Sequence, residues 1–186
     1  MARATRAAAH KPEVIGSPRR RRLRRLALTQ APAPWLTPGK QHLACCILRS
    51  FERAFGRPLL AGAATQDGLQ AAQLLFRADT VVLAHDGGSD PALIYANAAA
   101  LQLWERSWAE MVGMPSRLTA EPQERASRAQ MLATALQQRA SQGYSGVRIS
   151  QSGRRFQIHN ARLWTLWGPG DQPCGQAAAF SDWWWL

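Results

Sequence analysis

Cysteine and histidine are the residues of this chain best suited to metal binding or nucleophilic chemistry, and their spacing favours neither. The 186 residues include three cysteines and four histidines, without a C-x-x-C or H-x-x-x-H pair. G-x-S-x-G and P-loop motifs are also missing from the sequence. Cys45 and Cys46 are adjacent and would bridge only with strain, and Cys174 stands alone, so we expect a reducing compartment. We therefore predict no metal site and no catalytic residue.

A run of arginines near the N-terminus is the strongest charge signal. Residues 1–40 contain ten Lys or Arg and one acid, a net charge of +9, whereas residues 41–186 carry +2. The centre of this basic arm consists of Arg19, Arg20, Arg21, Arg22, Arg24 and Arg25. Mutual repulsion and five prolines predict a disordered arm over 1–40, followed by a folded domain over 41–186.

Three interpretations of the arm stay open. It is a solvated tail or the extension of a mispredicted start, or it binds nucleic acid, because arginines neutralise phosphates and release counterions without needing a fold. The third interpretation is an organelle transit peptide, which is Arg-rich and poor in acids. The sequence lacks an apolar run of about 18 residues, so we expect no membrane span. We expect a cytoplasmic protein, or an organelle-targeted one if the arm is a transit peptide.

Asn97 stands where a β-favouring pair runs into a helix-forming stretch, in "IYANAAALQLW". Its side chain could contact a ligand or could cap the helix that follows. A capping oxygen accepts a bond from the first helical turn and contributes about 1 kcal/mol, and aspartate caps as well as asparagine. We favour the cap, and we expect Asn97→Asp to keep most of the stability.

The elements around these residues follow from apolar periodicity and turn residues. Helices are predicted over 43–55, 67–76, 98–104 and 107–111, and a long one from Pro122 to Gly143. Strands are predicted over 81–83, 93–95, 144–150, 155–167 and 175–183. In the strand over 155–167 we expect Phe156, Ile158, Trp164 and Leu166 to share one face, with a bulge near Asn160. The order predicts an α+β fold with a five-stranded antiparallel sheet, helices between strands 2 and 3, and N-terminal helices before it.

Five blocks in chain order resemble the MEKHLA domain family, which is PAS-like. They are "ILRSFERAFGRPLL" (Ile47–Leu60), "IYANAAALQLWERSW" (Ile94–Trp108), "PSRLTAEP" (Pro115–Pro122), "YSGVRISQSGRRFQIHNARLW" (Tyr144–Trp164) and "CGQAAAFSDW" (Cys174–Trp183). Members occur as small bacterial proteins and as the C-terminal part of plant homeodomain-leucine-zipper transcription factors, where they are thought to sense a signal or modulate dimerisation. A homeodomain or zipper does not precede the blocks, so the resemblance implies the stand-alone form.

The resemblance implies a pocket between the sheet and the inserted helices. Its candidate residues are Tyr95, Trp104, Arg148, Asn160 and Trp164. The two tryptophans could equally pack in the core or an interface. Asn160 is the more informative, because a buried amide needs partners that a ligand, a water or the protein could supply.

Cofactors known among PAS relatives leave a trace in the sequence. Flavin photosensors of this kind carry an Asn-Cys dipeptide in the helical insert, and haem binders often use a histidine of the long helix. This chain has no cysteine between Asn97 and Gly143 and no histidine in 121–142; His85 and His159 lie elsewhere. Adduct photochemistry and haem are therefore disfavoured, and the cofactor stays unknown.

The interpretation we favour is a non-catalytic PAS-like sensory or regulatory module that binds a small molecule or a protein partner. The alternative is a nucleic-acid-associated regulator, in which the arm alone binds nucleic acid and the domain dimerises. The closing "DWWWL" predicts Trp183 and Trp185 on one face and Trp184 on the other, with at least one ring exposed. Exposed aromatic rings often mark contact surfaces, so a homodimer is expected.

Overall fold

The fold was analysed in a computed structural model, which describes residues 33–62, 67–126, 129–130 and 139–186. The chain divides into two units, Met1–Ala31 and Pro32–Leu186, and every described residue belongs to the second. The arginines of the arm, Arg19 to Arg25, therefore lie outside the described residues, and the predictions made for them stay predictions.

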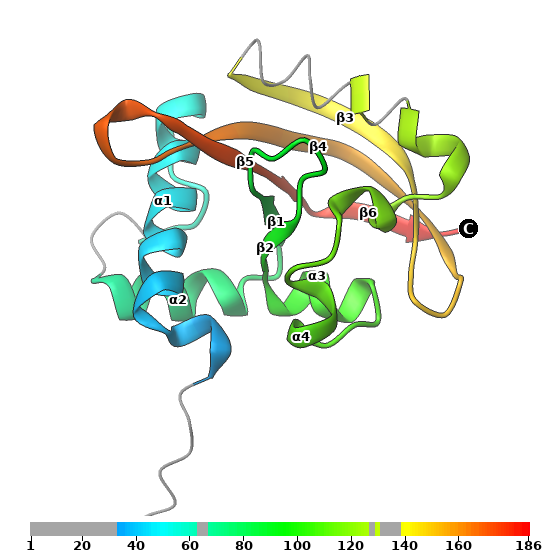
Figure 1. The fold of residues 1–186 in the computed structure, drawn as a ribbon, viewed down its shortest axis with the longest axis horizontal. Helices are drawn as coiled ribbons and strands as arrows, with labels where there is room; N and C mark the ends of the chain where they lie inside the picture. Colours follow the sequence, from blue (N-terminus) through cyan, green and yellow to red (C-terminus); the bar gives the residue numbers. More distant parts are fainter. Residues whose placement is uncertain (1–32, 63–66, 127–128, 131–138) are drawn as a thin grey trace, which may run out of the picture. The chain divides into compact units, whose positions relative to one another are not determined.

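The described unit is an antiparallel sheet with helices before and within it (Figure 1). The helices are α1 (Pro38–Phe55), α2 (Gly68–Arg77), α3 (Ala98–Leu103) and α4 (Trp108–Met111), with 3-10 turns η1 (Pro34–Leu36), η3 (Ser116–Thr119), η4 (Pro122–Glu124) and η5 (Pro169–Asp171). The strands are β1 (Val81–His85), β2 (Leu93–Ala96), β3 (Ala140–Ile149), β4 (Arg155–Trp167), β5 (Pro173–Phe180) and β6 (Asp182–Trp185). None of the helices in the described part is long and apolar enough to cross a membrane.

The N-terminal helices start earlier than the predicted domain boundary. Trp35 of η1 stacks on Phe76 of α2 with ring centroids 3.8 Å apart. Lys40 donates a 2.8 Å hydrogen bond to the carbonyl of Ile94. Residues that we had assigned to the arm thus pack on the domain. α1 ends where predicted, because Gly56 takes a left-handed conformation with φ of 67°.

The sheet has the strand order β2-β1-β5-β4-β3 with antiparallel neighbours, so the last strands of the chain fill its centre. α3, α4, η3 and η4 lie between β2 and β3, as predicted. The predicted last strand over 175–183 is divided, because the chain breaks at Ser181 into β5 and β6. β6 continues along β4, pairing Ile158 with Trp183, so the described residues form a six-stranded sheet where five strands were predicted.

The predicted long helix from Pro122 to Gly143 is wrong at its C-terminal end. Ala140 already pairs with Trp164 in the sheet, and Arg139 before it has a φ of 64°. Sheet pairing overrode the helical pattern there, since Ala140 gains a partner strand. Residues 131–138, where the predicted inward leucines fall, lie outside the described residues.

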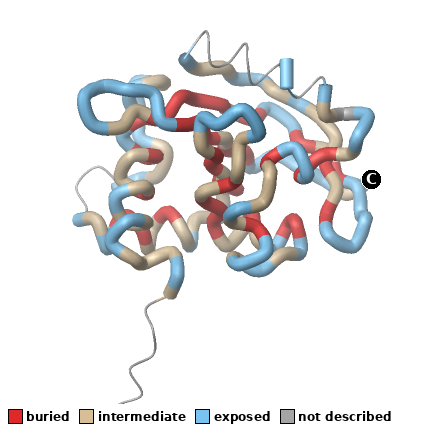
Figure 2. Tube along the Cα trace, viewed as in Figure 1, coloured by how far each residue is buried: buried red, intermediate tan, exposed pale blue. Residues whose placement is uncertain are grey.

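Each face of the sheet packs on its own apolar cluster. Figure 2 shows how buried residues gather along the strands and the inner sides of the helices. One cluster joins α1 and α2 to the sheet through residues such as Ile47, Phe51 and Trp164. The other lies on the opposite face, beneath the inserted helices, and includes Trp104 and Phe156. The fold is therefore a sheet between two layers of helix.

A bulge at Asn160 moves the two halves of β4 onto different faces. Asn160 has a φ of 53°, a region that asparagine tolerates better than most residues. Phe156 and Ile158 before it belong to the insert-side cluster, whereas Trp164 and Leu166 after it belong to the α1-side cluster. The bulge was predicted, but the prediction that all four share one face is wrong.

Candidate functional site

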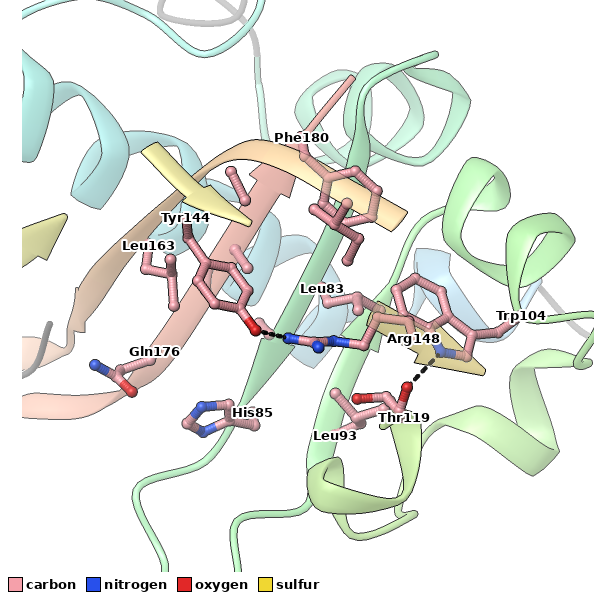
Figure 3. Close-up of a pocket in the computed structure, with 15 residues that line it drawn as sticks. Leu83, His85, Leu93, Trp104, Thr119, Tyr144, Arg148, Leu163, Gln176 and Phe180 are labelled. Carbon is pink, nitrogen blue, oxygen red and sulfur yellow. Dashed lines mark hydrogen bonds between the residues drawn. The ribbon is translucent and has the colours of Figure 1, made fainter. Parts of the chain in front are cut away.

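A cavity of about 50 Å³ lies on the insert side of the sheet (Figure 3). Side chains from β1, β2, β3, β4 and β5 form its floor and walls, and Trp104 and Thr119 of the insert complete it. Most of its lining is apolar and includes Leu83, Leu93, Ile158, Ala161, Leu163, Ala178 and Phe180. Its polar members are His85, Thr119, Tyr144, Arg148 and Gln176. The cavity thus combines a mainly apolar shell with a few polar groups, as ligand sites commonly do.

Arg148 supplies the only formally charged guanidinium or ammonium group among the residues that line this cavity. The residue is 4% exposed, and its guanidinium donates to the Val147 carbonyl at 2.6 Å and to the Tyr144 hydroxyl. Figure 3 shows the Tyr144 phenol and the Arg148 guanidinium pointing toward each other. Burying a charge is costly unless it is paired, so this side chain is the most informative in the cavity.

Alternation along β3 brings this pair together. Tyr144, Gly146 and Arg148 are spaced by two residues, which places them on one face of a strand. A Cβ at Gly146 would lie 2.5 Å from the Tyr144 hydroxyl oxygen and 3.2 Å from an Arg148 nitrogen. The missing side chain of Gly146 therefore leaves the space in which the phenol and the guanidinium meet.

The His85 ring and the Trp104 indole at the border of the cavity each contact a backbone carbonyl. His85 pairs with Gln176 across β1 and β5, and the His85 Nδ1 lies 2.5 Å from the Asp86 carbonyl oxygen. Trp104 Nε1 donates to the Thr119 carbonyl at 3.3 Å, which ties α3 to η3 above the cavity. Both contacts restrict the side chains that border the cavity.

The structure brings together two of the five predicted pocket residues, Trp104 and Arg148. Tyr95 and Trp164 are buried in the α1-side cluster instead, on the other face of the sheet. Trp164 Nε1 donates to the Ile47 carbonyl at 3.2 Å. Burial raises the pKa of the Tyr95 hydroxyl, which has no hydrogen-bond partner in the described part of the chain. Asn160 is exposed, so the prediction of a buried amide in the pocket is wrong.

Sequence reasoning missed four polar contributors to the cavity, His85, Thr119, Tyr144 and Gln176. The Tyr144–Arg148 spacing was a usable signal, because both residues fall on one face of a predicted strand with a glycine between them. Gln176 could not be found in this way, since its pairing with His85 joins residues far apart in the sequence.

Asn97 is a cap, as predicted, and more than a cap. Its Oδ1 accepts from the Ala100 N–H at 3.1 Å, in the first turn of α3, and from the Val82 N–H at 2.9 Å. Its Nδ2 donates to the carbonyls of Ala78 and Thr80 at 3.0 and 2.7 Å. The side chain is fully buried and lies outside the cavity lining.

The cavity does not fit the larger cofactors of PAS relatives. A water needs about 10–15 Å³ of such a space, so the cavity holds three to five waters and is too small for a flavin or a haem. Its lining contains no cysteine that could form an adduct. Among the described residues, no group of three or more His, Cys, Asp or Glu is arranged to hold a metal ion. The three cysteines are free thiols.

The sheet order, the inserted helices and the cavity between them define the chain as a PAS-like α+β domain. One solved structure with this fold is the PAS domain of a protein from Colwellia psychrerythraea, with a TM-score of 0.53, 16% identity and coverage of 59% of this chain and 91% of that chain. Another is the light-oxygen-voltage (LOV) protein of Rhodobacter sphaeroides, with a TM-score of 0.51, 16% identity and coverage of 61% and 63%. These identities establish likeness of fold.

An RNA-binding light-oxygen-voltage receptor is also similar, with a TM-score of 0.53, 20% identity and coverage of 69% of this chain. This chain spans only 36% of that receptor's length. A comparison with curated proteins gave no match. Residues 41–185 match the MEKHLA domain, and the chain therefore belongs to the MEKHLA domain family.

Proposed function

We propose that this domain is a non-catalytic sensory module that binds a small molecule in the cavity between the sheet and its helical insert. The observation that carries the proposal is the buried guanidinium of Arg148 in the wall of a mainly apolar cavity. A core that served packing alone would gain stability from an apolar residue at this position. We expect an arginine that lowers the stability of the domain at this position to bind a ligand.

The two sides of the cavity belong to different parts of the fold. Ala178 and Leu163 come from the central strands, whereas Trp104 and Thr119 come from the insert. A ligand between them contacts both layers, so its binding shifts the balance between conformations that space them differently. This is how occupancy of the cavity would become a signal for a partner.

A thermal-shift experiment with a cavity-filling variant tests the proposal. Small-molecule fractions are extracted from the source cells and added to the full-length protein. At least one fraction should raise the melting temperature, because a ligand that binds only the native state stabilises it. Ala178→Leu, which adds three carbons to the cavity wall, should abolish the shift. The matched control Ala109→Leu, at an exposed position of α4, should retain it.

Equal shifts in the wild type and Ala178→Leu would place the binding elsewhere and contradict the proposal. The proposal is also contradicted if no fraction raises the melting temperature of the wild type at any concentration. The alternative, an Arg-rich arm that binds nucleic acid, stays a separate prediction, because its residues lie outside the described part.

A further inference from the structure

We propose that the ligand is a small organic carboxylate whose charge pairs with Arg148 and whose apolar body fills the rest of the cavity. This inference rests on the proposed function and adds to it the chemical class of the ligand.

Among the described residues, no acidic side chain pairs with the guanidinium of Arg148. The ion pairs between described residues join Arg53 to Asp171, Arg117 to Asp90, Arg154 to Glu105 and Arg155 to Glu121. None of these described pairs includes Arg148, and the cavity lining contains no Asp or Glu. An anion from outside the chain would therefore supply the missing charge.

The hydrogen bonds of Arg148 leave room for such an anion. A guanidinium has five N–H groups. One is directed to the Val147 carbonyl and one to the Tyr144 hydroxyl, so three have no partner in the described part of the chain. The planar fork of an arginine matches the two oxygens of a carboxylate. The Tyr144 hydroxyl, which accepts from Arg148, keeps its own proton to donate to the same ligand.

The space beyond the charge is apolar and small. Leu83, Leu163 and Phe180 border it beside the polar side chains of His85, Thr119 and Gln176, and the described lining residues include no Lys and no second Arg. Its volume of about 50 Å³ corresponds to three to five waters, or a molecule of roughly 90–150 Å³. A monocarboxylate with a short aliphatic chain or a single ring has this bulk. Phosphate would need more donors and would leave the apolar wall unused.

Calorimetry with matched probes tests the ligand class. The probes are hexanoate, its neutral counterpart hexanamide, and inorganic phosphate, each titrated into the full-length protein. Hexanoate should bind, hexanamide should bind roughly 10- to 100-fold more weakly, and phosphate should not compete. Arg148→Met should remove the preference for hexanoate over hexanamide. Arg154→Met, at an exposed arginine of the β3–β4 turn, should preserve it.

A stability measurement separates a binding arginine from a structural one. Without ligand, Arg148→Met should melt at a higher temperature than the wild type, because it removes an uncompensated buried charge. Gly146→Ala should weaken hexanoate binding although Arg148 is unchanged, because the Cβ of the alanine displaces the Tyr144 hydroxyl. A lower melting temperature for Arg148→Met together with unchanged hexanoate binding would make the arginine structural and overturn the inference.

The remaining outcomes distinguish this inference from the proposed function. If cell extracts shift the wild type but hexanoate and hexanamide bind equally, the sensory role stands and the carboxylate class falls. Tighter binding of phosphate than of hexanoate also overturns the class. If neither extracts nor probes bind, both proposals fail.

Discussion

The Asn97 side chain joins the start of α3 to the first strand of the sheet, because its Oδ1 accepts from the Val82 N–H at 2.9 Å while capping Ala100. Sequence reasoning found the cap but not the link to β1, which depends on the hairpin geometry. The Nδ2 faces carbonyl oxygens, including that of Thr80 at 2.7 Å. Aspartate has no donor to offer these carbonyls, so our expectation that Asn97→Asp keeps most of the stability is revised.

Asn97→Ala and Asn97→Asp should therefore both destabilise the domain, by about 3 kcal/mol for alanine, since buried donors and acceptors lose their partners. The exposed cap Ser107→Ala on α4 should cost about 1 kcal/mol and is the matched control. Urea unfolding of the three variants gives the comparison. If the Asn97 variants lose no more unfolding free energy than Ser107→Ala does, the link to β1 contributes nothing to stability.

Asn160 should be needed for the backbone conformation of the β4 bulge and not for ligand binding. Its φ of 53° disfavours branched and bulky side chains, so Asn160→Val should cost about 1–2 kcal/mol and Asn160→Gly much less. Neither variant should change hexanoate affinity, although the sequence had made Asn160 a candidate pocket residue. Selective loss of binding at unchanged unfolding free energy would restore Asn160 to the site.

Glu105 should make the domain sensitive to acid. Hydrogen bonds from Ser152, in the β3–β4 turn, lower the pKa of this carboxyl, and Arg154 lowers it further. A lowered folded pKa contributes stability that is complete above the ordinary value of about 4.3 and is lost as the pH falls through the folded value. Wild type should thus be more stable than Glu105→Gln at pH 7, and the difference should shrink at acid pH. Glu52→Gln, at an exposed position of α1, is the control; a difference that is independent of pH would contradict the account.

Deleting residues 1–31 should leave the unfolding free energy unchanged and remove any binding to duplex DNA. Six arginines between 19 and 25 can neutralise phosphates, so binding by the full chain should be non-specific and weaken steeply with salt. A fragment over 41–186 should be less stable than one over 32–186, because it lacks the stack of Trp35 on Phe76. Sequence-selective DNA binding by the 32–186 fragment would assign that function to the domain.

The parts of the fold that depend on local pattern could be predicted from the sequence. The stop of α1 at Gly56, the β1–β2 hairpin and the bulge near Asn160 follow from residues within a few positions. The pocket was harder to predict than these elements. A bulge of one residue moves every later side chain of the strand to the opposite face of the sheet. Trp164 lies on the far face for this reason, and Tyr95, a pocket candidate through the family resemblance, lies in the same cluster.

The C-terminal rings illustrate the same division. Their alternation was predicted from the sequence and is confirmed: Trp183 and Trp185 both contact Phe156, while Trp184 lies near His159 and is 50% exposed. The break at Ser181 was not predictable from the sequence alone, because it lies opposite the Asn160 bulge of β4, between the pairs Arg162–Ala179 and His159–Asp182. A homodimer through these rings stays a prediction.

Native mass spectrometry of the full-length protein, purified from its own cells without denaturation, tests the central claim most directly. We expect a mass excess of one small organic molecule per chain, lost on denaturation, that is identified as a carboxylate and is missing from Ala178→Leu. The same preparation of Ala109→Leu should carry it. A wild-type protein that carries no excess mass and gains none on incubation with cell extract would contradict the claim that this cavity binds a ligand.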